Sequence, residues 1–128
     1  MINSLSIDLL IRIKNAYKAG KKEISTPLSK FCQNICEILK KHQYITSYSV
    51  DKDNRLLIIN LKYTNQCPAV NDVKIFSKPG RRYYSKTSTI PWGKVNNSLI
   101  IISTSSGLLS QREAVKKNFG GELIAEIY

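Results

Sequence analysis

Apolar positions near the start of the chain recur every three or four residues, which is typical of a helix with one buried face. This pattern predicts a helix over residues 5–18, with Ser4 as its N-cap and Gly20 at its end. The predicted apolar face consists of Leu5, Leu9, Leu10, Ile13 and Tyr17. The opposite face carries Arg12, Lys14, Asn15 and Lys18. A basic helix face of this kind is either a solvated surface or a binding surface, and the pattern alone supports both.

The next elements alternate between strand and helix. Residues 23–26 form a predicted strand that Pro27 stops, and residues 30–42 form a predicted helix that Ser29 caps. A hairpin follows, with strands over residues 46–51 and 55–63 and a turn at residues 52–54. The apolar faces of this helix and of the second hairpin strand consist of Phe31, Ile35, Ile38, Leu39, Leu57, Ile59, Leu61 and Tyr63. This order predicts an α+β unit of two helices over three strands.

An aperiodic segment, residues 64–72, divides the chain. We therefore predict an N-terminal α-β-α-β-β domain over residues 1–64, a linker over residues 65–72 and a C-terminal domain over residues 73–128. The C-terminal domain is expected to be mostly β with one short helix. Its predicted elements are strands at residues 73–77 and 99–102, a polar loop at 103–107, a helical stretch at 108–119 and a final strand after Gly120-Gly121. Ser110 and Glu113 match a capping box for that helix. The predicted fold class is thus α+β, with two small, closely packed domains.

Composition adds a strong positive charge to this picture. The 128 residues include 20 Lys and Arg against 9 Asp and Glu, for a net charge of +11. Residues 1–64 contribute +6 and residues 65–128 contribute +5, so the charge is not confined to a tail. Such an excess indicates a polyanionic partner, either a nucleic acid or an anionic membrane. No apolar run approaches the roughly 20 residues of a membrane span, and the first helix lacks Trp and Phe in its apolar stripe, so a nucleic acid is favoured.

Two segments of the C-terminal half carry chemistry suited to nucleic acid. The run Ser103-Thr104-Ser105-Ser106-Gly107 offers small hydroxyl side chains, which donate to and accept from sugars, phosphates and base edges. The alternative is that this run is only a loop that caps the next helix. The run Arg81-Arg82-Tyr83-Tyr84 sets two guanidinium groups, which grip phosphates, beside two aromatic rings, which stack on bases. The alternative for this run is an edge strand guarded by charge.

Residue types that serve catalysis or metal binding do not form a matched set. Cys32 and Cys36 lie four apart on a predicted helix, and with Cys67 and His42 they lack the second close pair of a zinc site. Small buried side chains are the better interpretation of both helical cysteines. We predict no catalytic residue, no metal and no cofactor, so an enzyme is the least supported class. A nucleic-acid-processing enzyme remains the alternative from another class, and it would need a carboxylate cluster.

Three motifs of the C-terminal half together resemble one family. They are Lys78-Pro79-Gly80-Arg81-Arg82-Tyr83-Tyr84, then Ile102-Ser103-Thr104-Ser105-Ser106-Gly107, then Gly120-Gly121-Glu122. In the N-terminal half, residues 8–15 are similar to the family's first helix and residues 27–30 to the entry of its second helix. Over nearly its whole length, the chain resembles the bacterial-type ribosomal small-subunit protein eight.

The resemblance implies a structural, non-enzymatic protein of two tightly packed α+β domains that binds small-subunit rRNA in its central domain. The C-terminal domain is expected to grip the minor groove of an irregular stem, and the protein to support subunit assembly and translation. The implied RNA-binding residues are Ser103, Thr104, Ser105, Ser106, Gly107, Arg81, Arg82, Tyr84, Glu122, Arg12, Lys14, Asn15 and Lys30. Among these, Tyr84 and Arg82 would support the hydroxyl surface and Glu122 would order the loop or the RNA. The implied partners are rRNA and neighbouring ribosomal proteins such as numbers five and seventeen, with no membrane and no small-molecule substrate.

The sequence departs from the family pattern at several positions. Residues 90–97 replace a glycine-rich loop, Ser106 stands where Lys is usual, and Ser110 stands where Thr is usual. Together with an excess of Lys over Arg, 15 to 5, these departures favour a mitochondrial, organelle-encoded member, with a bacterial cytoplasm or a plastid as alternatives. The alternative function is a free-standing RNA-binding regulator or RNA chaperone on the same fold. Such a protein would bind many RNAs with little preference.

Overall fold

The computed structural model describes residues 4–77, 80–90 and 98–128, and it divides into two compact units. One unit spans Leu5–Asn71 and the other contains Asp72–Tyr128. Both units combine helix with antiparallel sheet, so the chain has the predicted α+β class. Lys78 and Pro79 of the proline-glycine motif, and residues 91–97 with Trp92, lie outside the described residues.

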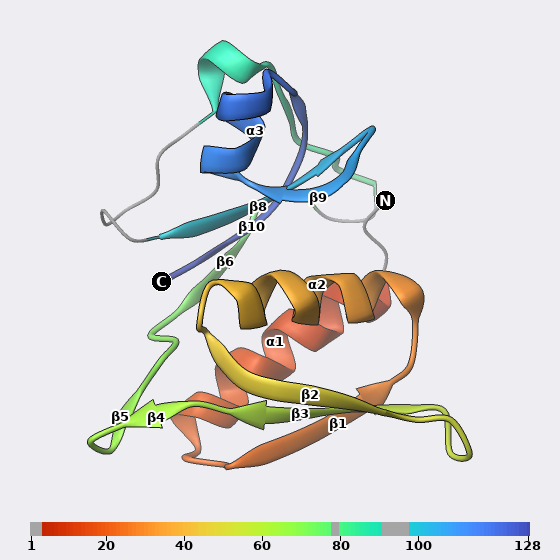
Figure 1. The fold of residues 1–128 in the computed structure, drawn as a ribbon, viewed down its shortest axis with the longest axis vertical. Coiled ribbons are helices and arrows are strands. Elements are labelled where there is room, and N and C mark those ends of the chain that lie inside the picture. The colour runs from red at the N-terminus through yellow and green to blue at the C-terminus, as the bar shows by residue number, and fades with distance from the viewer. Residues whose placement is uncertain (1–3, 78–79, 91–97) are drawn as a thin grey trace. The chain divides into compact units, whose positions relative to one another are not determined.

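Two amphipathic helices form one layer of the Leu5–Asn71 unit (Figure 1). Helix α1 spans Ser4–Lys18, and α2 spans Lys30–Lys41 with His42 as its C-cap. The Ser29 hydroxyl accepts a hydrogen bond from the Cys32 amide at 3.1 Å, which confirms the predicted N-cap. The buried side chains of the two helices include Leu9, Leu10, Ile13, Tyr17, Cys32, Ile35, Cys36, Ile38 and Leu39. The helical spacing in the sequence therefore identified the correct faces, and both helical cysteines are buried as expected.

A three-stranded antiparallel sheet forms the second layer of this unit. Its strands are β1 (Glu23–Pro27), β2 (Ile45–Asp51) and β3 (Leu56–Leu61), in the order β1-β3-β2. The alternation along β3 holds, because Leu57, Ile59 and Leu61 are buried while their neighbours are half-exposed. Both helices lie over one face of this sheet (Figure 1).

The segment predicted to be an aperiodic linker begins with a small hairpin. Strands β4 (Tyr63–Thr64) and β5 (Cys67–Pro68) pair with each other. The prediction missed this hairpin because its two turn residues, Asn65 and Gln66, take positive φ values of 50° and 66° without a glycine to signal the turn.

The Asp72–Tyr128 unit is built on a five-stranded antiparallel sheet around its last strand. The strands are β6 (Val73–Ile75), β7 (Tyr84–Ser85), β8 (Leu99–Thr104), β9 (Gly107–Ser110) and β10 (Gly121–Ile127). The order is β6-β10-β8-β9, and β7 also pairs with β10. A short 3-10 helix, η1 (Thr87–Thr89), and helix α3 (Gln111–Lys117) complete the unit.

The helical stretch predicted over residues 108–119 is wrong at both ends. Residues 107–110 form β9, because they find hydrogen-bonding partners along β8 that a local helix would not use. Ser110 is nevertheless the N-cap of α3: its hydroxyl accepts from the Glu113 amide at 3.2 Å. The helix ends at Lys117, before the predicted end at residue 119, since Asn118 takes the left-handed conformation with φ of 61°.

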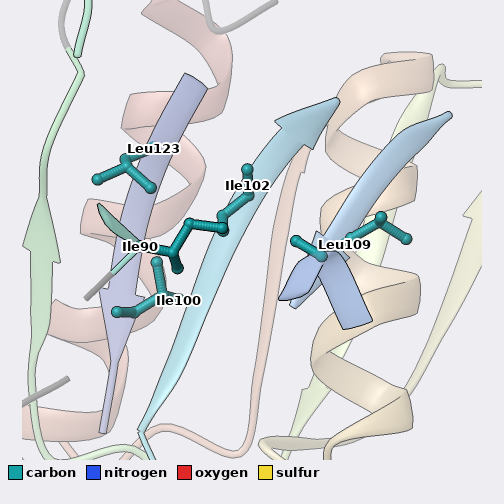
Figure 2. Packing of buried hydrophobic residues seen from close by; sticks show 6 residues of the cluster. Ile90, Ile100, Ile102, Leu109 and Leu123 are labelled. Carbon is teal, nitrogen blue, oxygen red and sulfur yellow. The ribbon is translucent and has the colours of Figure 1, made fainter. Parts of the chain in front are cut away.

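Aliphatic side chains of the sheet and α3 form the core of this unit. Figure 2 shows Ile90, Ile100, Ile102, Leu109 and Leu123 gathered into one cluster, which also includes Ala114 of α3. Phe76 and Phe119 pack against it. Because Ile102, Leu109 and Leu123 occupy paired positions on three adjacent strands, the residues next to them in sequence point to the opposite face of the sheet. That opposite face carries the candidate site.

Candidate nucleic-acid interface

The hydroxyl-rich run is an ordered β-hairpin turn. Ser103 and Thr104 end strand β8, Ser105 and Ser106 form the turn, and Gly107 begins β9 with φ of +105°. The Thr104 hydroxyl donates to the Gly107 carbonyl at 2.9 Å and accepts from the Ser106 amide at 3.1 Å. The Thr104 hydroxyl therefore donates its hydrogen bond within the turn and stabilises it. Gly107 has a positive φ, a backbone conformation that favours glycine.

Three serine hydroxyls remain free to meet a ligand. Ser103 is half-buried, whereas Ser105 and Ser106 are exposed. None of the three side chains makes a hydrogen bond with another described residue. The expectation that this run only caps the following helix does not hold, since the cap of α3 is Ser110. We name Ser103, Ser105 and Ser106, with the turn that Thr104 and Gly107 hold, the serine turn.

A row of paired residues connects the serine turn to Tyr84. Glu122 in β10 is directly opposite Ser103 in β8 on one side and Tyr84 in β7 on the other. Residues directly opposite in antiparallel strands point to the same face of the sheet. Tyr84 is 70% exposed, so its ring is available for stacking on the face that carries Ser103. The sheet thus joins two segments that are 19 positions apart in the sequence.

Glu122, the middle residue of this row, forms an ion pair with Arg82. The Arg82 Nη1 donates to Glu122 Oε2 at 3.3 Å, with the Arg82 side chain 24% exposed and the Glu122 side chain 6% exposed. A nearly buried carboxylate requires such a partner, because removing an unpaired charge from water costs on the order of several kcal/mol. The attraction within the ion pair offsets this desolvation cost. Arg81, in contrast, is exposed, and its side chain makes no hydrogen bond or ion pair with another described residue. The two neighbouring arginines therefore have different surroundings.

Ser77 is a positioning residue that the sequence analysis did not single out. This buried serine accepts from the Tyr83 amide at 2.9 Å and donates to the Leu123 carbonyl at 2.6 Å. The Tyr83 carbonyl in turn accepts from the Leu123 amide at 2.8 Å. Ser77 thereby ties the arginine-tyrosine segment to strand β10. The only signal in the sequence was a small polar residue at the end of a predicted strand, which is too common to be informative.

The glycine pair at the start of β10 allows a close approach to strands β8 and β7. A Cβ atom on Gly121 would come within 2.2 Å of the Ser103 carbonyl oxygen, and one on Gly120 within 2.7 Å of the Ser85 carbonyl oxygen. Both distances are shorter than real Cβ contacts allow, and both obstacles are backbone atoms. Glycine is therefore required on packing grounds at these two positions, which hold the serine turn and the Tyr84 strand against β10.

The predicted RNA-binding residues of the N-terminal half lie in the Leu5–Asn71 unit. Arg12 and Asn15 are exposed on α1, Lys14 is half-buried on the same helix, and Lys30 is exposed at the start of α2. The Arg12 guanidinium donates to the Ser25 carbonyl of β1 at 3.0 Å, which fixes its position over the edge of the sheet.

Two of the three cysteines, Cys32 and Cys36, are buried on α2, and Cys67 is exposed. Burial raises the pKa of the Cys36 thiol to about 12 and also raises the pKa of Cys32, so both stay protonated and inert. Within the described ranges, no three His, Cys, Asp or Glu residues come together as a candidate metal site. Among the described helices, none has the length and apolar character needed to span a membrane.

An α+β chain with a strong basic excess, a serine turn and an exposed tyrosine on one sheet face has the surface chemistry of an RNA-binding protein. A family model described as ribosomal protein S8 matches residues 5–128. The chain therefore belongs to the ribosomal protein S8 family, as its motifs had indicated.

Similar bacterial proteins cover almost the whole chain. A protein of Mycoplasmopsis pulmonis is 42% identical over 123 residues, which are 94% of this chain and 93% of that protein. A protein of Erythrobacter litoralis is 40% identical over 94% of each chain. A protein of Oleidesulfovibrio alaskensis is 39% identical over 128 residues, with complete coverage of both chains. Each of these relatives is named small ribosomal subunit protein uS8.

Proposed function

We propose that this protein is a structural constituent of the small ribosomal subunit that binds small-subunit rRNA through the face carrying the serine turn and Tyr84. The observation that carries the proposal is the row Tyr84–Glu122–Ser103, which sets an exposed aromatic ring beside free hydroxyls on one sheet face. Membership of a ribosomal protein family supports the ribosomal location and a non-enzymatic role.

The chemistry of this face suits the minor groove of folded RNA. That groove is wide and shallow, and it displays 2′-hydroxyls and base edges that small donors and acceptors reach without steric conflict. Ser103, Ser105 and Ser106 would read these groups, and Tyr84 would stack on a base or sugar. Arg81, exposed on the neighbouring segment, would contribute a phosphate contact that weakens as salt rises.

The remaining interface residues have supporting roles in this proposal. Thr104 and Gly107 hold the turn, while the Arg82–Glu122 pair links the arginine-tyrosine segment to β10. Arg12, Lys14, Asn15 and Lys30 would meet RNA from the other unit. The mechanism is thermodynamic: the protein would select one RNA conformation by contacts that only that conformation offers, and so support subunit assembly and translation.

Finer features of the proposal come from the resemblance to the family. We propose the central domain of the rRNA, and an irregular stem within it, as the binding site. Ribosomal proteins five and seventeen are the proposed neighbours in the subunit. The excess of Lys over Arg supports a mitochondrial ribosome as the location, whereas the relatives described above are bacterial.

Binding of the full-length chain to RNA across a salt series tests the proposal. The probes are a small-subunit rRNA transcript and an unrelated structured RNA of equal length. A preference for the rRNA that persists as salt rises would support a defined site, because hydroxyl contacts lose little affinity to salt while phosphate contacts lose much. Equal affinity for both RNAs, falling in parallel as salt rises, would contradict the proposal. It would favour the free-standing regulator or chaperone, which needs only the net charge of +11 to bind RNA.

A further inference from the structure

A groove of about 570 Å³ lies within the Leu5–Asn71 unit, between the C-terminal half of α1 and strand β1. Its volume lies within the ~300–1,000 Å³ range of small-molecule sites. The residues that line it are Arg12, Asn15, Ala16, Ala19, Lys21, Glu23, Ile24 and Ser25. Strand β1 follows α1 in the chain after a short turn, and Figure 1 shows both elements in the same unit.

Small side chains and a tight turn create the space. Ala16 is buried and Ala19 is exposed, and neither fills the gap beside the half-buried Ile24. The turn that follows α1 passes through Gly20 at φ of +71°, with no atom within 4 Å of where its Cβ would be. Its backbone is closed by hydrogen bonds from the Ala19 amide to the Asn15 carbonyl at 2.9 Å and from the Lys21 amide to the Ala16 carbonyl at 3.0 Å. The groove is therefore a feature of ordered backbone.

The polar groups of the groove are of two kinds. Arg12 and Lys21 are cations, and Glu23 is the one anion among the lining residues, so the lining carries one net positive charge. Asn15, Ser25 and Glu23 offer donors and acceptors of the kind that read base edges. The side chains of Asn15, Lys21 and Glu23 make no hydrogen bond or ion pair with another described residue, so their hydrogen-bonding capacity is available to a ligand.

We propose that this groove binds a single unstacked nucleotide of RNA. The face of the base would lie against Ala16 and Ile24, with its edge toward Asn15, and the flanking phosphates would meet Arg12 and Lys21. Arg12 is already held by the Ser25 carbonyl at 3.0 Å, so little side-chain entropy is lost when it meets a phosphate. This inference rests on the proposed RNA-binding function, in which Arg12 and Asn15 meet RNA, and it names the part of the RNA that these residues would hold.

Filling the groove without changing its charge tests the inference. Ala19→Leu occupies the space beside Ile24, and Ala19→Ser is the matched control that keeps the groove open. Because Ala19 is exposed, both variants are expected to unfold at the urea concentration of the natural chain. We expect Ala19→Leu to weaken binding to the small-subunit rRNA transcript about tenfold, the loss of roughly one stacked base. Binding by Ala19→Ser should be unchanged, and rRNA affinity equal to that of the natural chain in Ala19→Leu would overturn the inference.

A second measurement separates this inference from the proposed function. Nuclear magnetic resonance signals of the natural chain are followed while a short single-stranded RNA of mixed sequence is added. We expect the Asn15 side-chain amide and the Ala19 backbone amide to shift, while Ser49, exposed on β2, stays in place. Absence of shifts at Asn15 would overturn the inference. Shifts at Asn15 in a chain that shows no preference for rRNA would support the groove while contradicting the ribosomal role.

Discussion

The backbone of Gly121 lies so close to Ser103 that no side chain fits between them. A Cβ atom on Gly121 would be 2.2 Å from the Ser103 carbonyl oxygen and 3.0 Å from its carbonyl carbon. This approach sets the position of β8 at the point where the serine turn begins. The glycine motif near the C-terminus and the serine motif before it are therefore two parts of one structural feature.

Substitution of this glycine should disturb both stability and RNA binding. In Gly121→Ala, strand β8 or β10 must move to relieve the contact, and we expect the free energy of unfolding to fall by about 2 kcal/mol. The displaced serine turn should also lose affinity for rRNA. Urea unfolding and RNA titration measure the two effects. Ser106→Ala, an exposed turn substitution, should keep its stability within about 0.5 kcal/mol, and a Gly121→Ala variant as stable as this control would contradict the packing argument.

Ser105 and Thr104 should respond differently to removal of their hydroxyls. Ser105 is exposed and has no partner among the described residues, so Ser105→Ala should leave stability unchanged. It should weaken rRNA binding by roughly 1–3 kcal/mol, the cost of a hydrogen bond lost from a buried interface. Thr104→Ala removes the bonds that hold the turn, and should lower stability by about 1 kcal/mol as well. Thr104→Ser keeps the hydroxyl, so its stability and its rRNA affinity should equal those of the natural chain. Full rRNA affinity in Ser105→Ala would show that the serine turn does not contact the RNA.

Alanine substitutions at the two adjacent arginines should have different effects. We expect Arg82→Ala to lower stability and Arg81→Ala to change the salt dependence of RNA binding. Arg82→Ala leaves the nearly buried carboxylate of Glu122 without this partner, and should lower the free energy of unfolding by about 2 kcal/mol. Adding Glu122→Gln in the same chain should recover part of this loss, because the unpaired charge is gone. Arg81→Ala should leave stability unchanged but flatten the salt dependence of RNA binding by roughly one contact. Equal stability losses in the two arginine variants would contradict the distinction.

Tyr17 should make stability fall at high pH. Burial raises the pKa of Tyr17 from 10.0 to about 12, against the opposing effect of the hydrogen bond from the Lys62 amide. Below pH 10 the phenol is neutral in both states. Between pH 10 and 12 the unfolded chain loses this proton while the folded chain keeps it, so Tyr17 should remove on the order of 2 kcal/mol of stability over that range.

The comparison of the natural chain with Tyr17→Phe isolates this effect. The variant loses hydrogen bonds to the Tyr44 carbonyl and from the Lys62 amide, so it should be less stable by about 1–2 kcal/mol at pH 8. Its stability should then fall less steeply between pH 10 and 12 than that of the natural chain, as measured by urea unfolding at each pH. Parallel pH curves for the two proteins would contradict the raised pKa. Tyr84→Phe, an exposed change, provides the control.

Local patterns in the sequence were sufficient for most of the Leu5–Asn71 unit. The helical period identified the buried faces of α1 and α2, Ser29 identified the start of α2, and the alternation along β3 identified its buried side. These features depend on contacts between residues close in sequence, or on a period that one layer of packing imposes along the chain. The same logic found Ser110 as the cap of α3.

The residues of the candidate site could be named from motifs, but their arrangement could not. The residue patterns gave Arg81, Arg82 and Tyr84 as one cluster and the serine turn as another, and only the resemblance to the family assigned Arg82 and Tyr84 to the same surface as the hydroxyls. Pairing of both clusters with β10 at Glu122 brings them together. The motif also gave no difference between the two arginines, although Arg82 forms an ion pair with Glu122, 40 positions away in the sequence.

The amino-acid sequence alone determined the fold class, the family, the excess of positive charge and the N-caps of α2 and α3, because each follows from composition, motif or neighbours along the chain. Only the tertiary structure decided that residues 107–110 form a strand, that Ser77 ties two segments together, and that Gly121 admits no side chain. It also decided that small residues leave a groove beside β1. The physical reason is the same in each case: hydrogen-bond partners and excluded volume come from residues distant in the sequence, and only the folded chain brings them within reach.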